Sequence, residues 1–157
     1  MDLTSLKSRL QAALTGKVAI LCIGSRSRGD DIFGPLVAKR IAGKVSAEVF
    51  DAENVPENYL GKIAKLEPDV VLLVDAAHFD AAPGQLRLLD PQDLQESSFS
   101  THSASLKLIE EFFQSECNAR VFMLAVQAEH VRFGALPSPA IIAAVDSVVD
   151  ILTEILN

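Results

Sequence analysis

The sequence predicts an α/β fold of three layers, in which a mostly parallel, twisted sheet of about five strands carries helices on both faces. Short apolar runs alternate along the chain with segments of helical periodicity, an order typical of βαβ units. The runs at 17–23 and 69–75 are apolar between their ends, which indicates strands buried on both faces. The 157 residues are 49% hydrophobic and 22% charged, so one core can form and a disordered chain is excluded. We expect a single domain over residues 1–157, with residues 1–16 as an N-terminal helical extension.

Each element in the first half of the chain has its own start or stop signal. The predicted elements are a helix at 3–14, a strand at 17–23, a helix at 30–41, a strand at 47–50 and a helix at 58–66. Gly16 follows the first helical pattern, Gly24 stops the first strand, Gly43 lies beyond the second helix and Pro68 closes the third. Acidic residues in its first turn also favour the helix at 30–41.

The second half of the chain continues the same alternation. The predicted elements are a strand at 69–75, a strand at 85–89, a helix at 103–115, a strand at 119–126 and a helix at 139–156. The strand at 85–89 alternates in hydropathy and follows a turn at Pro83 and Gly84, which indicates an edge strand. The inner stripe of the last helix is expected to be Ile142, Val145, Val149, Leu152 and Leu156.

Charge and cysteine content exclude several functions. With 14 Lys and Arg against 21 Asp and Glu, the net charge is −7, which disfavours nucleic acid and anionic membrane surfaces as partners. Cys22 and Cys117 are too few for a disulfide framework or a zinc site, so reduced, buried thiols are expected. Residues 1–16 lack a signal-peptide pattern, and no apolar stretch has the ~20 residues that span a bilayer. We therefore expect a cytoplasmic protein without membrane insertion.

Polar residues beside the predicted strands point to a site. Because the carboxyl ends of parallel strands meet at one edge of a sheet, we expect Asp31, Asp75 and His102 to converge there. Two carboxylates and an imidazole suit ions such as nickel or zinc. Two further interpretations stay open, in which Asp30 or Asp31 caps a helix, or Asp31 and Asp75 form a metal-free pair for general acid–base hydrolysis.

The glycine-rich turn at 24–35 does not fit a nucleotide site. Its spacing is not G-x-G-x-x-G, no P-loop lysine follows, and Asp30 and Asp31 near a helix N-terminus would repel phosphate. The chain also lacks a G-x-S-x-G nucleophile elbow, and Cys22 lies inside a strand, so serine and thiol nucleophiles are not expected.

Six motifs in order resemble those of the hydrogenase maturation endopeptidases, which trim the C-terminus of the large subunit of nickel–iron hydrogenases. The motifs are GSRSRGDDIFGP, PEN, LLVDA, PGQLRLLD, STHS and AVQAEH. The resemblance runs from about residue 17 to residue 157, nearly the whole chain. The PEN loop and the PGQLRLLD turn are most similar to the branch that serves formate-hydrogenlyase-type hydrogenases.

The resemblance implies an endopeptidase, a hydrolase that activates another enzyme by removing a C-terminal peptide from its nickel-loaded large-subunit precursor. Asp31, Asp75 and His102 match the family's nickel-recognising residues, and we expect them to be both the metal-binding and the catalytic set. The nickel then belongs to the substrate, no cofactor is resident, and cadmium or zinc would mimic the ion. The expected partner is the precursor, and the expected state is a monomer. The expected substrate-binding residues are Gly24, Asp30, Glu53, Asn54, Glu57, Asn58 and Gln127.

Two rival functions belong to other classes. The chain could instead be a non-catalytic metal-sensing or nickel-chaperone scaffold of the same fold, or a small-molecule enzyme with a carboxylate pair. It also departs from the family's usual pattern, with Ser25 after Gly24 and with Ile32 and Phe33 after the acidic pair. Arg26 and Arg28 add positive charge beside the predicted metal site, which either discourages a cation or steers an acidic precursor tail.

Overall fold

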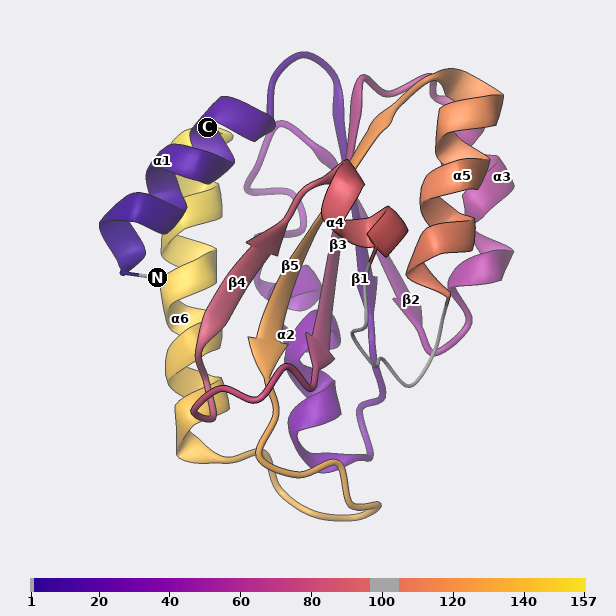
Figure 1. The fold of residues 1–157 in the computed structure, drawn as a ribbon. Helices are drawn as coiled ribbons and strands as arrows, with labels where there is room; N and C mark the ends of the chain where they lie inside the picture. The colour runs from indigo at the N-terminus through magenta and orange to yellow at the C-terminus, as the bar shows by residue number, and fades with distance from the viewer. Residues whose placement is uncertain (1, 97–104) are drawn as a thin grey trace.

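The computed structural model describes residues 2–96 and 105–157, and in these the chain forms a five-stranded sheet between two layers of helices (Figure 1). The strand order is β2-β1-β3-β5-β4. The strands are β1 (Val18–Ile23), β2 (Glu48–Glu53), β3 (Val70–Ala77), β4 (Leu86–Leu89) and β5 (Arg120–Gln127). This arrangement confirms the predicted α/β fold.

The described sheet is parallel except at one edge. β1 pairs with β2 and β3, and β3 pairs with β5, all in parallel. β4 runs antiparallel to β5 at the end of the sheet, which confirms the predicted edge strand. Every residue of β1 and β3 is buried, as their continuous apolar runs indicated. The carboxyl ends of β1, β3 and β5 lie side by side at the lower edge of the sheet in Figure 1.

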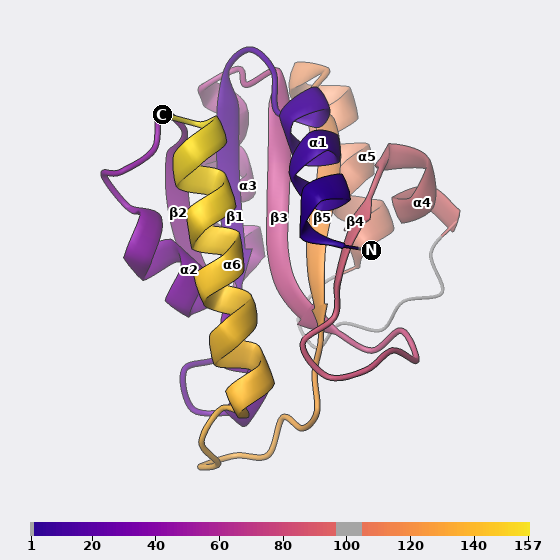
Figure 2. The ribbon, with the colours of Figure 1, turned by 90° about the vertical axis from the view of Figure 1, so that its left-hand side faces the viewer.

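The helices form one layer on each face of the sheet. They are α1 (Leu3–Ala13), α2 (Phe33–Ile41), α3 (Leu60–Lys65), α4 (Pro91–Glu96), α5 (Leu106–Cys117) and α6 (Pro139–Ile155). α1, α2 and α6 pack on the face that carries Ile20, Leu72 and Leu124, whereas α3, α4 and α5 pack on the opposite face. Figure 2 shows α1 and α6 in front of the sheet and α3 and α5 behind it. Among the described residues, no helix combines the length and apolar character that a membrane span requires.

The structure corrects the prediction that Asp30 or Asp31 caps a helix. The predicted helix at 30–41 divides into a 3-10 segment, Gly29–Ile32, and α2, which begins at Phe33. The residues at the two N-cap positions are Arg28 and Ile32, and neither forms a capping hydrogen bond through its side chain. Both aspartates are buried instead, and Asp30 forms its hydrogen bonds with another loop. The bulk of Phe33 serves the core, where the side chain is fully buried.

Several element boundaries also differ from the prediction. β3 continues past Asp75 to Ala77, β2 reaches Glu53, and the segment predicted as a helix from Asn58 begins as a 3-10 turn, Pro56–Asn58. The six residues of α4 were not predicted, because so short a helix shows little periodicity. The inner stripe of α6 is wrong at Ile142, which is 41% exposed, and Ile141 and Val148 face the core instead. Because α6 carries apolar residues on most sides, its sequence did not determine which side faces the core.

Candidate functional site

Asp31 and Asp75 approach each other where β1 and β3 end. Asp31 lies in the 3-10 segment that follows β1, and Asp75 is near the end of β3, the neighbour of β1 in the sheet. Their residues are only 2% and 1% exposed. By strand alternation Asp75 shares the face of Leu73 and Ala77, which α3, α4 and α5 cover. Two carboxylates are thus brought together in the interior, as the strand-end argument predicted.

The electrostatic environment of Asp75 favours its protonated form. Burial raises the pKa of the Asp75 carboxyl well above its usual range, and the nearby Asp31 carboxylate raises it further. The backbone N–H of Ala76 opposes these two effects to a smaller extent. Neither carboxylate oxygen of Asp75 accepts a well-formed hydrogen bond from any residue in the part of the chain that the structure describes. A buried carboxylate without donors is costly, and a cation is the natural compensation.

A tight reversal of the backbone places Asp31 beside the end of β1. Gly24 has φ +152°, and a Cβ at this position would lie 2.1 Å from the carbonyl oxygen of Asp31. The Ser25 N–H donates to the same carbonyl over 3.0 Å. The Gly24 N–H donates to the carbonyl oxygen of Glu53 over 2.7 Å, which joins this turn to the end of β2. Gly24 therefore shapes the site through its backbone, since no side chain fits there.

Asp30 anchors the loop between β5 and α6. Its residue is fully buried, and its carboxylate accepts hydrogen bonds from the backbone N–H groups of Glu129 (2.7 Å), His130 (3.3 Å) and Ser138 (2.7 Å) and from the Ser138 hydroxyl (3.0 Å). The Asp30 N–H in turn donates to the His130 carbonyl oxygen over 3.0 Å. Asp30 thus holds the 3-10 segment that carries Asp31 against the residues that follow β5.

Arg26 connects two loops beside the site through ion pairs. Its guanidinium forms ion pairs with Asp51 and with Glu53, the latter at 2.7 Å, and so ties the loop after β1 to the end of β2. After Glu53, the connection from β2 to α3 exposes Asn54, Glu57 and Asn58. The loop residues predicted to bind substrate are therefore accessible at the carboxyl edge of the sheet.

Gln127 holds the connection between β3 and β4. Its Oε1 accepts from the N–H groups of Phe79 (2.8 Å) and Ala81 (3.3 Å), and its Nε2 donates to the Ala128 carbonyl oxygen over 2.9 Å. The same Nε2 lies 3.3 Å from Nδ1 of His78. Gln127 is 6% exposed, and its amide is engaged by these neighbours.

The third predicted ligand, His102, lies outside the described residues. Within 2–96 and 105–157, no group of three or more His, Cys, Asp or Glu side chains is placed to hold a metal ion. Both cysteines are free thiols. Burial raises the pKa of the Cys22 thiol, and the Asp51 and Asp75 carboxylates raise it further, so this thiol stays protonated. Cys117 is only half-buried, contrary to the prediction.

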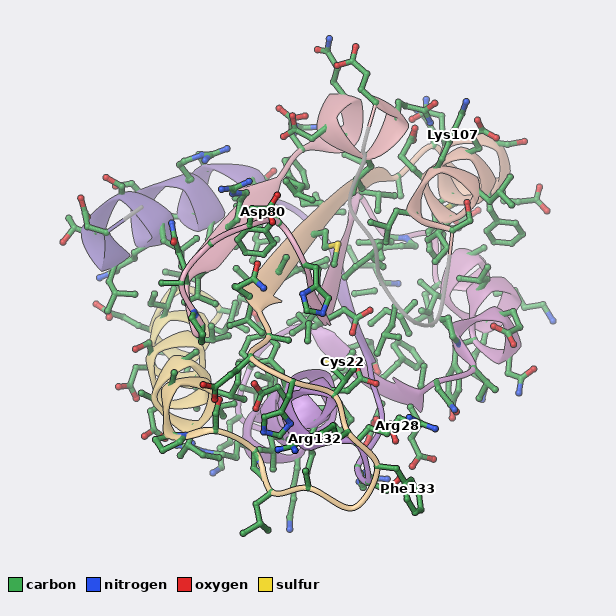
Figure 3. All side chains as sticks on the ribbon, turned by 60° about the horizontal axis from the view of Figure 1, so that its bottom comes forward. Cys22, Arg28, Asp80, Lys107, Arg132 and Phe133 are labelled. Atoms are coloured by element: carbon green, nitrogen blue, oxygen red, sulfur yellow. The ribbon has the colours of Figure 1, made fainter. Side chains whose placement is uncertain are left out.

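Sequence reasoning missed the loop that faces the site from the end of β5. This loop carries the exposed apolar side chains of Phe133 and Leu136, and Figure 3 shows Phe133 at the carboxyl edge, beside Arg28 and Arg132. An available signal was the presence of two large apolar residues in a segment punctuated by Gly134 and Pro137, where neither strand nor helix periodicity explains them.

Comparisons with known proteins agree with the resemblance seen in the motifs. Residues 36–155 match the sequence profile of the family described as hydrogenase maturation protease. The chain is 33% identical, over 73% of its length and 74% of the relative's, to the hydrogenase 3 maturation protease of Escherichia coli K12.

Two solved structures share both fold and sequence similarity. The crystal structure of the nickel–iron hydrogenase maturation protease HycI from Thermococcus kodakarensis matches 94% of this chain and 98% of its own, with TM-score 0.86 and 29% identity. The solution structure of the endopeptidase HycI from Escherichia coli matches 88% of this chain and 90% of its own, with TM-score 0.77 and 29% identity. The matching profile, the curated relative and the shared fold together show that the chain belongs to the hydrogenase maturation proteases, a family of peptidases.

Proposed function

We propose that this chain is the endopeptidase that removes a C-terminal peptide from the nickel-loaded large-subunit precursor of a nickel–iron hydrogenase, acting as a monomer in the cytoplasm. Asp31, Asp75 and His102 recognise the nickel that the substrate carries. The observation that carries the proposal is the pair of buried carboxylates, Asp31 and Asp75, at the shared edge of β1 and β3. Carboxylate oxygens that are buried away from water are suitable ligands for a divalent cation, because the cation compensates their charge.

The raised pKa of Asp75 supports a mechanism in which the ion binds only together with the substrate. Because burial and Asp31 raise the pKa of Asp75, this carboxyl retains a proton at pH values where an exposed aspartate has lost it. An arriving cation displaces this proton and converts the pair into two anionic ligands. No resident cofactor is then required, and cadmium or zinc can stand in for nickel at the same oxygens.

The substrate in this proposal is a protein tail. An open groove of about 410 Å³ lies between the 3-10 turn Pro56–Asn58 and α5, where Leu60, Leu108 and Phe112 supply apolar walls. Apolar side chains of an extended precursor tail can pack against these walls. Glu57 lines it, and Glu53, Asn54 and Asn58 lie exposed on the same connection, where they contact the precursor. The similarity to a hydrogenase 3 maturation protease favours a precursor of that class.

The first prediction concerns the proposed ligands. We expect Asp31→Asn, Asp75→Asn and His102→Ala each to lower the rate of precursor processing about a hundredfold or more, because each removes one donor to the substrate's ion. Incubation with nickel-loaded precursor, followed by intact-mass spectrometry, measures the loss of the C-terminal peptide. Asp146→Asn is the matched control, since Asp146 is an exposed carboxylate on α6 that pairs with Arg40.

The outcomes separate the proposal from its rivals. Normal processing by all three variants contradicts the assignment of Asp31, Asp75 and His102. Binding of the precursor by the unaltered protein without any loss of mass favours a non-catalytic scaffold. Processing that proceeds equally well on nickel-free precursor contradicts recognition of the ion.

A further inference from the structure

The loop between β5 and α6 exposes two large apolar side chains. Phe133 is 75% exposed and Leu136 is 84% exposed, the highest values among the large hydrophobic residues that the structure describes. They lie three residues apart on one loop, next to the segment that carries Asp31. Exposed apolar side chains that gather on one loop are a candidate contact surface.

The loop is held in place, so the exposure does not result from a frayed segment. Asp30 fixes its two ends through hydrogen bonds to Glu129 and Ser138. The Gly134 N–H donates to the Ser27 carbonyl oxygen over 2.7 Å, which ties the middle of the loop to the turn after β1. The Arg28 guanidinium lies 5.7 Å from the centre of the Phe133 ring, within the range of a cation–π contact. A partner therefore meets a surface that is already ordered.

Two arginines lie beside these side chains on an otherwise acidic protein. Arg28 and Arg132 are exposed, and no described carboxylate lies within ion-pair distance of either. Arg26 differs, because Asp51 and Glu53 already neutralise it. On a protein with a net charge of −7, two exposed arginines against the single exposed carboxylate of the loop, Glu129, favour a partner that presents carboxylates.

We propose that Arg28, Arg132, Phe133 and Leu136, which we call the loop surface, dock the folded body of the hydrogenase precursor through an apolar patch rimmed by carboxylates. The inference rests on the proposed function. A tail that reaches Asp31 and Asp75 brings the body of its own protein over the adjacent carboxyl edge, where Figure 3 shows Arg28, Arg132 and Phe133 together. The apolar groove between Pro56–Asn58 and α5 then binds the C-terminal tail of the precursor, and the loop surface binds its folded body.

The apolar part is tested with the double variant Phe133→Ser, Leu136→Ser. We expect KM for the nickel-loaded precursor to rise about tenfold or more, with a faster dissociation rate, because central apolar contacts act mainly on dissociation. Steady-state processing and biolayer interferometry on immobilised precursor measure the two effects. Leu3→Ser is the matched control, since Leu3 is a 49% exposed leucine on α1, and it leaves both values unchanged.

The charged part is tested with Arg28→Glu and Arg132→Glu. We expect each variant to slow association several-fold at low salt and to converge on the unaltered protein at about 0.5 M salt, where surface charges are screened. Lys44→Glu is the control, because Lys44 is exposed beyond the end of α2, away from the edge where the site lies. Thermal unfolding verifies that all variants remain folded.

The failure of this inference is distinguishable from failure of the proposed function. If the unaltered protein does not process the precursor, the proposed function fails. If it does, and the double variant keeps the same KM and dissociation rate, the loop surface is not a docking site. A self-associated state of the protein that the double variant abolishes, detected by sedimentation, assigns the surface to a second copy of this chain and also overturns the inference.

Discussion

At the scale of single residues, two adjacent aspartates have different tasks. Asp30 and Asp31 lie in a 3-10 segment, in which successive side chains point about 120° apart. Asp30 faces the loop after β5 and accepts four hydrogen bonds there. Asp31 acts electrostatically on Asp75, whose two oxygens have no well-formed hydrogen bond within the described part of the chain. One carboxylate therefore stabilises the fold, and the other serves the site.

Asp75 should reduce the stability of the metal-free protein as the pH rises. Its folded-state pKa is raised, so the native state binds more protons than the unfolded state, and stability falls from the unfolded pKa upward through the folded one. We expect Asp75→Asn to be more stable than the unaltered protein at neutral pH, by about 1 kcal/mol or more, with the difference shrinking toward pH 4.

Calorimetry of both proteins with a chelator, at a series of pH values, measures this difference. The other titrating groups cancel between the two proteins, so the change with pH isolates the Asp75 carboxyl and its coupling to Asp31. A difference that stays constant with pH, or that grows toward acid, contradicts the raised pKa.

At the scale of elements, the loop between β5 and α6 is fixed by hydrogen bonds rather than by regular structure. The fully buried Asp30 supplies the acceptors for three backbone N–H groups of that loop. Gly29 contributes as well, because a Cβ there would lie 2.6 Å from Nδ1 of His130. The position of the loop surface therefore depends on two residues of the preceding turn.

We expect Asp30→Ala to destabilise the protein by about 3 kcal/mol, because it removes four hydrogen bonds and leaves the buried N–H of Ser138 and the half-buried N–H groups of Glu129 and His130 without their acceptor. Ser138→Ala removes one of the four hydrogen bonds and should cost about 1 kcal/mol. Urea unfolding at fixed pH compares the two variants. Equal costs would show that the Asp30 carboxylate is not the anchor of this loop.

α1 is the other element with a role that the structure clarifies. Leu6 and Leu10 are buried in the same cluster as residues of α2 and α6. We propose that residues 1–16 fold with the remainder as one domain, because removing α1 would expose this apolar surface to water.

At the scale of the whole molecule, ion binding and folding are linked. Any cation that binds the folded carboxylate pair and not the unfolded chain stabilises the protein by mass action. In the proposed function such an ion displaces a proton from Asp75, so we expect the stabilisation to increase with pH.

We therefore expect millimolar cadmium or zinc to raise Tm, and to raise it more at pH 8 than at pH 6. Differential scanning fluorimetry with and without the metal measures the shift. Asp75→Asn should abolish most of it, whereas Asp146→Asn should keep it, since Asp146 lies at the exposed surface of α6. An equal shift in both variants would indicate ion binding elsewhere on the acidic surface.

Local patterns were enough to predict much of this protein. Continuous apolar runs identified β1, β3 and β5, because buried parallel strands have few polar positions. Alternation with helices then implied a parallel sheet, and a parallel sheet implied that residues after β1 and near the end of β3 share an edge. Asp31 and Asp75 were therefore predictable as neighbours from sequence alone, and the ordered motifs pointed to the family that the comparisons show.

Contacts between distant segments were decided only by the tertiary structure. The sequence could not assign different tasks to Asp30 and Asp31, because the difference depends on backbone N–H groups about 100 residues away. It could not fix the phase of α6, where Ile141 is buried and Ile142 is exposed, since both are equally apolar. It also could not show that Phe133 remains exposed, because burial depends on how a loop is anchored, and Asp30 and Ser27 provide that anchor from another part of the chain.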